Sequence, residues 1–180
     1  NAVVLYNLAG ISRSKTALAE LDWSAHRRLD LRLAYRFVDA VTSRISSDAF
    51  RDPFVSRHRG FAQVSYASRL ADEGGQWRGD ATIQWVGVQR LPSTAMNPEP
   101  FALPDMAPNY TQLNLQLTRD FSTATSAYLG VENLTNVRQD RPILGAGAEP
   151  SDFDQYFDAS MVYGPIFGRM FYAGLRWRVL

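Results

Sequence analysis

The sequence of 180 residues has no cysteine and only two histidines, and it has no long apolar run. Without cysteine, disulfides, zinc–thiolate sites and thiol nucleophiles are excluded. The formal net charge is only +1 and no dense basic stripe is present, which argues against a nucleic-acid partner. Although 46% of the residues are hydrophobic, no run approaches the roughly 18 residues that a membrane-spanning helix needs. The apolar residues are instead dispersed along the chain.

Residues 77–88 show how the apolar residues are dispersed. Apolar or small side chains hold one parity of the segment, and the other parity holds Arg78, Asp80, Thr82 and Gln84. Because successive side chains of a strand point to opposite faces, such a strand has one apolar and one polar face. Soluble strands are usually about 5–6 residues long, whereas a tilted strand that crosses a bilayer needs about 9–11. The length of this segment therefore favours a transmembrane β-strand.

The same period predicts an all-β, antiparallel fold of about eight strands, with no helix beyond a turn or two in the long loops. The predicted strands are Ala2–Ala9, Thr16–Ser24, Leu29–Thr42, Gly60–Leu70, Trp77–Gln89, Tyr110–Arg119, Ser126–Thr135 and Phe167–Leu180. We expect residues 1–180 to form one domain. The chain starts inside the first strand and opens on no signal peptide, so we expect a mature or truncated piece.

Short and long connections alternate between these strands. The short ones are His26–Arg28, Ala71–Gln76 and Asp120–Thr125, and the long ones are Ser43–Arg59, Arg90–Asn109 and Val137–Pro165. Outer-membrane barrels have short periplasmic turns and longer extracellular loops, so the pattern predicts the orientation of the chain, with Leu180 at the periplasmic rim. The first connection, Gly10–Lys15, should then be extracellular but is short.

Aromatic and charged residues support the same orientation. Indole and phenol rings gather at membrane interfaces because they combine an apolar body with one polar group. We expect a periplasmic girdle of Trp23, Trp77 and Trp177, and an upper girdle of Tyr35, Phe37 and Trp85. The charged residues of the opposite parity should face the lumen, where water or a plug is present; they are Arg32, Arg36, Arg78, Asp80, Glu132 and Arg176.

Three segments carry a family resemblance. Tyr128–Asn136 reads YLGVENLTN, Phe157–Leu180 reads FDASMVYGPIFGRMFYAGLRWRVL, and Arg28–Phe37 reads RLDLRLAYRF. They resemble the C-terminal part of the β-barrel of TonB-dependent outer-membrane receptors, especially the Bacteroidetes-type forms. The resemblance implies a bacterial outer membrane and an open fragment of a barrel of about 22 strands, plugged by an N-terminal domain that has no counterpart in this chain.

The resemblance also implies partners and a function. Members take up scarce nutrients with energy that the TonB complex supplies through the plug. The expected partners are outer-membrane lipid, the plug domain and the rest of the barrel, and a small ligand on the extracellular side. That ligand would be a siderophore, cobalamin, a metal chelate or a glycan.

No catalytic constellation appears in the sequence, and we expect neither enzymatic activity nor a cofactor or metal. His26 and His58 have no second ligand at metal spacing, so both are interpreted as solvated loop histidines. The acidic residues of the last long loop lack the spacing of a calcium loop; they are Glu149, Asp152, Asp154 and Asp158. Met96 and Met106 are more typical of hydrophobic filler than of soft metal ligands.

Two other functions stay open beside nutrient uptake. One is a complete eight-stranded outer-membrane barrel with an anchoring or adhesion role. The other is a soluble barrel that binds a small apolar ligand, which requires the apolar face inside. We expect the fragment not to close, which would leave Ala2–Ala9 and Phe167–Leu180 as unpaired edges.

Overall fold

The computed structural model describes residues 12–43, 49–71, 75–147 and 149–179. These residues form a mostly antiparallel β-structure, so the all-β prediction is confirmed. The strands are β1 (Ser12–His26), β2 (Leu29–Ser43), β3 (Ala49–Arg51), β4 (His58–Ala67), β5 (Gln76–Val86), β6 (Gln89–Arg90), β7 (Met106–Ala107), β8 (Tyr110–Asp120), β9 (Thr125–Glu132) and β10 (Met170–Trp177).

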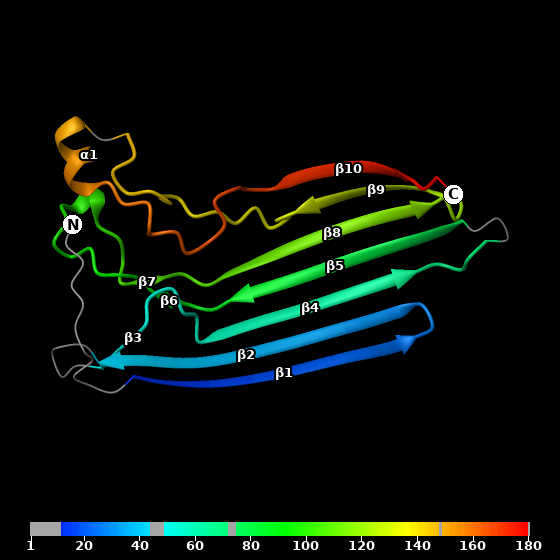
Figure 1. The fold of residues 1–180 in the computed structure, drawn as a ribbon, viewed down its shortest axis with the longest axis horizontal. Helices are drawn as coiled ribbons and strands as arrows, with labels where there is room; N and C mark the ends of the chain where they lie inside the picture. Colours follow the sequence, from blue (N-terminus) through cyan, green and yellow to red (C-terminus); the bar gives the residue numbers. More distant parts are fainter. Residues whose placement is uncertain (1–11, 44–48, 72–74, 148, 180) are drawn as a thin grey trace.

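The main sheet has the order β1-β2-β4-β5-β8-β9-β10, and β3 pairs with the end of β2. The strands run along the long axis of the molecule, with the short connections at one end and the long ones at the other (Figure 1). We call these the turn end and the loop end. Among the described residues, β1 and β10 are opposite edges with no ladder between them. The predicted first strand, Ala2–Ala9, lies outside the described residues.

The strand boundaries differ from the prediction at a few places. The predicted loop Gly10–Lys15 is wrong in its second half, because β1 already begins at Ser12. The predicted strand Ser126–Thr135 ends early, at Glu132. Asn133 adopts a left-handed backbone with φ 51°, and its N–H donates to the side chain of Asn114 at 2.8 Å. Asparagine tolerates this conformation better than most residues do, and the turn it makes ends the ladder.

The two described helices lie in long connections, as expected. The 3-10 helix η1 (Glu99–Phe101) and the α-helix α1 (Pro150–Tyr156) each begin with a proline in the first turn, where the missing N–H costs nothing. The ring of Phe101 stacks on that of Tyr156 with centroids 4.9 Å apart, which joins the two connections.

The small buried core lies mostly at the loop end and not under the sheet. Its apolar members are Val86, Leu91, Ala107, Val131, Leu144 and Met161. The chain exposes 12900 Å², whereas a compact monomer of 20.2 kDa would expose about 8,800 Å². Among the described residues no second layer covers either face of the sheet, and this accounts for the excess.

Two tyrosines lock the last three strands together on one face of the sheet. Tyr172 on β10 lies opposite Gly130 on β9, and its hydroxyl donates to Gln116 Oε1 on β8 at 3.0 Å. Tyr128 lies over Gly174 in the reciprocal arrangement. A Cβ at either glycine would overlap the tyrosine ring, and one on Gly130 would also lie 2.9 Å from the backbone oxygen of Leu115. The rings therefore need glycine beneath them.

Replacing Gly130 with alanine should destabilise the sheet. The Tyr172 ring would have to move and give up its bond to Gln116, so we expect a loss of about 1–3 kcal/mol in the free energy of unfolding. Urea titration followed by tryptophan fluorescence would measure it. Gly79→Ala is the matched control, because nothing lies within 4 Å of its Cβ position. Equal effects of the two substitutions would contradict the locking role of Tyr172.

Candidate functional site

The ladders sort the side chains of the seven long strands onto two faces. Residues paired in an antiparallel ladder point to the same side, so one row can be followed across the whole sheet. The row that contains Trp23 continues through Leu31, Val64, Ala81, Leu115, Val131 and Phe171. We call this side the apolar face and the opposite side the polar face.

Charge separates the two faces. On the seven long strands, the only charged residues with the parity of the apolar face are Arg13, Lys15 and Asp39 at the loop end and Arg119 at the turn end. Between the rows of Phe37 and Arg119 the apolar face carries no charge. The polar face holds Glu20, Asp22, Asp30, Arg32, Arg36, Arg59, Arg78, Asp80, Asp120, Glu132 and Arg176. All six residues predicted to face a lumen thus share this side.

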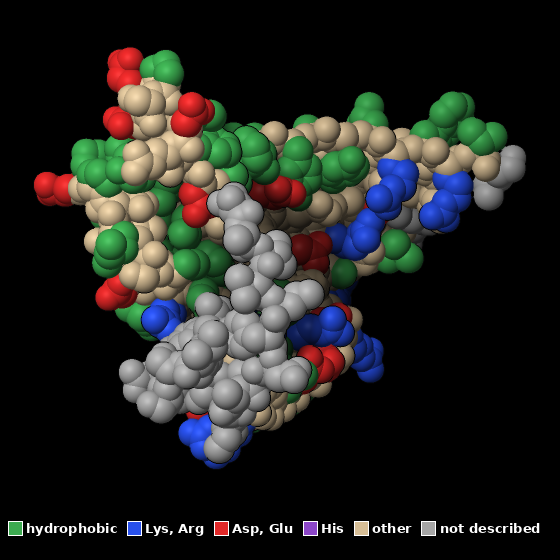
Figure 2. All heavy atoms as spheres, turned by 60° about the vertical axis from the view of Figure 1, so that its left-hand side comes forward, with side chains coloured by type: hydrophobic (Ala, Val, Ile, Leu, Met, Phe, Trp, Pro, Cys, Tyr) green, Lys and Arg blue, Asp and Glu red, His purple; other side chains and the backbone are tan. Residues whose placement is uncertain are grey.

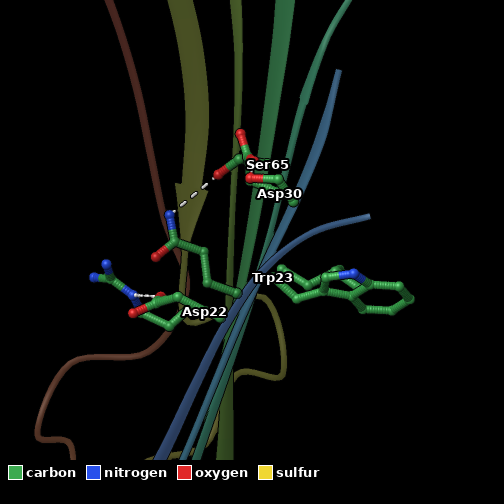
Figure 3. Close-up of a pocket in the computed structure, with 8 residues that line it drawn as sticks. Asp22, Trp23, Asp30 and Ser65 are labelled. Atoms are coloured by element: carbon green, nitrogen blue, oxygen red, sulfur yellow. Dashed lines mark hydrogen bonds and ion pairs between the residues drawn. The ribbon is translucent and has the colours of Figure 1, made fainter. Parts of the chain in front are cut away.

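Some charges of the polar face are paired. Arg78 donates twice to Asp120, at 2.8 and 2.9 Å, and Asp22 forms an ion pair with Arg32. Ser65 donates to Asp80 at 2.6 Å. Figure 3 shows that the indole of Trp23 points to the other side of the strands from Asp22. The Asp22–Arg32 pair is exposed to solvent and the Arg78–Asp120 pair is partly exposed, so neither adds much to stability.

Two arginines of the polar face lie directly opposite each other. Arg36 on β2 pairs with Arg59 on β4, and no ion pair with a carboxylate is recorded for either among the described residues. Like charges directly opposite in a sheet are destabilising. This position therefore accommodates an anionic group better than it accommodates another cation.

The aromatic residues of the apolar face lie toward its two ends. Trp23, Trp77 and Trp177 are all near the turn end of their strands, and they are 57%, 46% and 76% exposed. Trp85 is the next-to-last residue of β5 at the loop end, Tyr35 shares its row but lies near the middle of β2, and Phe37 lies two residues further toward the loop end. Large exposed apolar surfaces mark contact with a partner or a membrane.

His58 lies in a strand, so its interpretation as a solvated loop histidine is wrong. It begins β4 opposite Phe37, and its Nδ1 lies 2.6 Å from the hydroxyl of Tyr35. Its ring also lies 5.4 Å from that of Phe37. The hydroxyl of Tyr35 is thus held toward the loop end. His26 is the exposed last residue of β1.

The long connections pack into a cluster at the loop end, with Gln139 as its centre. Gln139 is buried, and its Nε2 donates to the carbonyl oxygens of Met161 at 2.9 Å and Arg141 at 3.1 Å. Its Oε1 accepts from the backbone N–H groups of Tyr163 at 2.9 Å and Gly164 at 3.3 Å. These four hydrogen bonds of one side chain hold backbone groups that no β-ladder pairs.

Other contacts extend the cluster across the connections. Arg141 donates to the carbonyl oxygens of Pro100 at 3.0 Å and Ala102 at 3.1 Å. Burial raises the pKa of the Tyr163 phenol, and the carboxylate of Asp140 raises it further, so the phenol stays neutral.

Acidic side chains gather at the tip around α1, at the upper left of Figure 2, whereas basic ones lie lower and to the right.

The other candidate sites of the sequence are not assembled by the fold. Among the described residues, no group of three or more His, Cys, Asp or Glu could hold a metal ion. The acidic residues of the last connection, Glu149, Asp152, Asp154 and Asp158, are therefore a charged surface. Met96 is 96% exposed and Met106 is 47% exposed.

Sequence reasoning missed two residues that the structure makes prominent. Arg119 has the parity of the leucines before it, so the alternation of β8 already placed an arginine on the apolar face. Gln139 gave no signal, because its partners lie 22 to 25 residues away in an irregular segment.

Comparisons with family models, curated proteins and solved structures found no match for this chain. No helix among the described residues is long and apolar enough to cross a membrane.

Gln139→Ala should loosen the loop cluster without affecting the sheet. It leaves two backbone N–H groups and two carbonyl groups without their partner, and each unsatisfied group costs about 1–3 kcal/mol. We expect faster hydrogen exchange in residues 137–147 and 158–165, with unchanged protection in β5 and β8. Gln112→Ala is the control, since no hydrogen bond is recorded for the Gln112 side chain. Unchanged exchange in the cluster would contradict the central role of Gln139.

Proposed function

We propose that this chain is the C-terminal part of the β-barrel of a TonB-dependent outer-membrane receptor that imports a scarce nutrient. The observation that carries the membrane location is the uncharged band on the apolar face. It crosses all seven long strands, while the polar face carries acidic and basic residues throughout. A lipid-facing surface excludes charge, because an arginine at the bilayer midplane costs about 2–4 kcal/mol.

The stagger of the tryptophans supports a tilted barrel wall. Trp77 lies four residues nearer the turn end than Ala81, which shares the row of Trp23 three strands along. Trp177 lies six residues nearer than Phe171, which shares that row six strands along. Averaged over all six steps, the stagger is one residue, about 3.3 Å, for each step of about 4.8 Å between strands. If the three rings share one plane, the strands tilt by about 35°, as in barrels.

The spacing of the two girdles fits a membrane. Trp77 and Trp85 are eight residues apart on β5, or about 26 Å along the strand. At a tilt of about 35° their separation along the membrane normal is about 22 Å, close to the apolar band of about 25 Å in outer-membrane barrels. Phe37 lies at nearly the height of Trp85, and Tyr35 lies lower but points its hydroxyl up to His58.

The transport role rests on the family resemblance together with two features of the sheet. Among the described residues β1 and β10 are open edges, which suit a piece of a larger barrel wall that continues on both sides. The polar face carries Arg36 and Arg59, which form no ion pair with a described carboxylate and suit a lumen that a plug or a ligand occupies. The ordered loop cluster lies where an extracellular ligand would first contact the receptor.

The two alternatives have less support. A complete eight-stranded barrel with an anchoring role requires its edge strands to join, and the described sheet has β1 and β10 apart. A soluble barrel that binds an apolar ligand would enclose the apolar face. Here Trp23, Trp77 and Trp177 of that face are exposed, and the arginines in the middle of the strands, such as Arg32, lie on the opposite side.

A pair of neighbouring arginine substitutions tests the membrane location. Ala81 lies midway between Trp77 and Trp85 on the apolar face, and Thr82 follows it on the polar face. Ala81→Arg should cost about 2–4 kcal/mol and sharply reduce the amount of folded protein in the outer membrane. Thr82→Arg should change folding by less than about 0.5 kcal/mol. Fractionation and heat-modifiable gel mobility would measure both, and equal tolerance would contradict a lipid-facing band.

Uptake assays test the transport role. A strain that lacks the gene should lose growth on one limiting supply among a ferric siderophore, cobalamin and an oligosaccharide. Reintroducing the gene should restore that growth, and removing TonB should abolish it again, because import needs energy from the inner membrane. Normal growth of the deletion strain on all three supplies, or uptake that persists without TonB, would exclude this function.

A further inference from the structure

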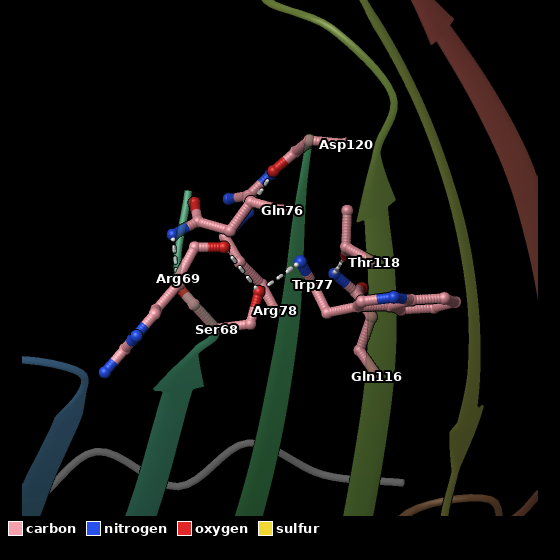
Figure 4. Close-up of polar contacts among 8 residues, drawn as sticks. All are labelled: Ser68, Arg69, Gln76, Trp77, Arg78, Gln116, Thr118 and Asp120. Atoms are coloured by element: carbon pink, nitrogen blue, oxygen red, sulfur yellow. Dashed lines mark hydrogen bonds and ion pairs between the residues drawn. The ribbon is translucent and has the colours of Figure 1, made fainter. Parts of the chain in front are cut away.

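Among the described residues of the long strands, Arg119 is the one charged residue near the turn end whose side chain has the parity of the apolar face. It is the next-to-last residue of β8, and its ladder partners are Trp77 on β5 and Ala127 on β9. It is therefore on the apolar face. Its neighbour Asp120 has the opposite parity and is held by Arg78 on the polar face, while the ring of Trp77 points away from that pair (Figure 4).

The surroundings of Arg119 orient its charge without neutralising it. The guanidinium carbon lies 5.2 Å from the centroid of the Trp77 ring and 6.0 Å from that of Phe121. Its Nη2 lies close to Gly75, where a Cβ would come within 3.2 Å. No ion pair with a carboxylate is recorded for Arg119 among the described residues. Stacking on aromatic faces leaves the N–H donors at the edge of the guanidinium group available.

An apolar groove of about 600 Å³ lies beside Arg119 and crosses the strands from β5 to β10 at the turn end. Its lining takes in the row of Trp77, Arg119 and Leu175 and the next row toward the loop end, which holds Leu117 and Leu129. Leu129 is 59% exposed and Leu175 is 83% exposed. The groove thus combines an exposed apolar lining with one cationic group.

We propose that this groove binds an anionic phospholipid, with the phosphate on Arg119 and an acyl chain on the apolar lining. The inference rests on the proposed membrane location, which puts the turn end at the periplasmic leaflet. An isolated phosphate would use Arg119 but not the leucines, and a neutral lipid would use the leucines but not Arg119. A phospholipid uses both, and the apolar face continues from the groove toward the loop end through Leu115 and Val131, where an acyl chain would extend.

Lipid retention by the purified full-length receptor tests the site. Native mass spectrometry after incubation with phosphatidylglycerol should show one retained lipid on the wild type and at least fivefold less on Arg119→Gln. Arg119→Lys keeps the charge and should retain most of the lipid. Arg176→Gln is the matched control, because it removes an arginine at the same end of the sheet but on the polar face. Its lipid retention should equal that of the wild type.

Further arms separate the sources of binding. Diacylglycerol, which lacks the phosphate, should be retained at least fivefold less, and inorganic phosphate alone should not raise the melting temperature. Equal retention of phosphatidylglycerol by Arg119→Gln, or an equal thermal shift with inorganic phosphate, would overturn the lipid site. These results leave the membrane location standing if the variants are recovered folded from the outer membrane. Failure of the wild type to reach that membrane would instead overturn the proposed function.

Discussion

The unbroken register of the ladders is the constraint on which the rest of the structure depends. Side chains alternate between faces with a period of two, so a slip of one residue in any ladder would move every following side chain to the wrong face. In the ladders that join the seven long strands, the one recorded irregularity lies between Ser24 and His26, beyond Trp23 and at the very end of β1. The separation of charge between the two faces therefore holds across all seven long strands between the rows of Phe37 and Arg119.

That separation also explains why the sheet has so little core of its own. The exposed ion pairs of the polar face contribute little, and no second layer of described residues packs on either side. A single sheet with both faces uncovered needs other surroundings to bury its apolar side chains. The contacts that are internal, such as Tyr172 over Gly130, fix which strands are neighbours and in which register.

Sequence reasoning worked where structure is local and failed where it is not. The alternation over Leu29–Phe37 was enough to predict β2 and both of its faces, because the period of a strand depends on adjacent residues alone. His58 was misread as solvated, since its partner Tyr35 lies 23 residues away. The polar residues of the loops look alike in sequence, and only the structure shows that Gln139 is among the buried ones. Arg119 was visible in the parity of β8 but stood at a strand end, where boundaries are least certain.

At the junction between the sheet and the loop cluster, the hydrogen bonds that hold the chain change from backbone ladders to side-chain bonds. The ladder of β9 stops at Glu132. The side chain of the next residue, Asn133, then binds the backbone: its Nδ2 donates to the carbonyl oxygens of Val137 at 2.7 Å and Phe167 at 3.1 Å. Beyond it, the N–H of Leu134 and the hydroxyl of Thr135 still donate to the carbonyl oxygens of Leu113 and Thr111 on β8. Further along, the loop is held by buried side-chain amides such as that of Gln139. Because that amide binds loop backbone, a change in this part of the loops alters the surface they present without forcing a slip of register in the sheet. The surface of the loops can therefore differ while the two faces of the sheet stay fixed.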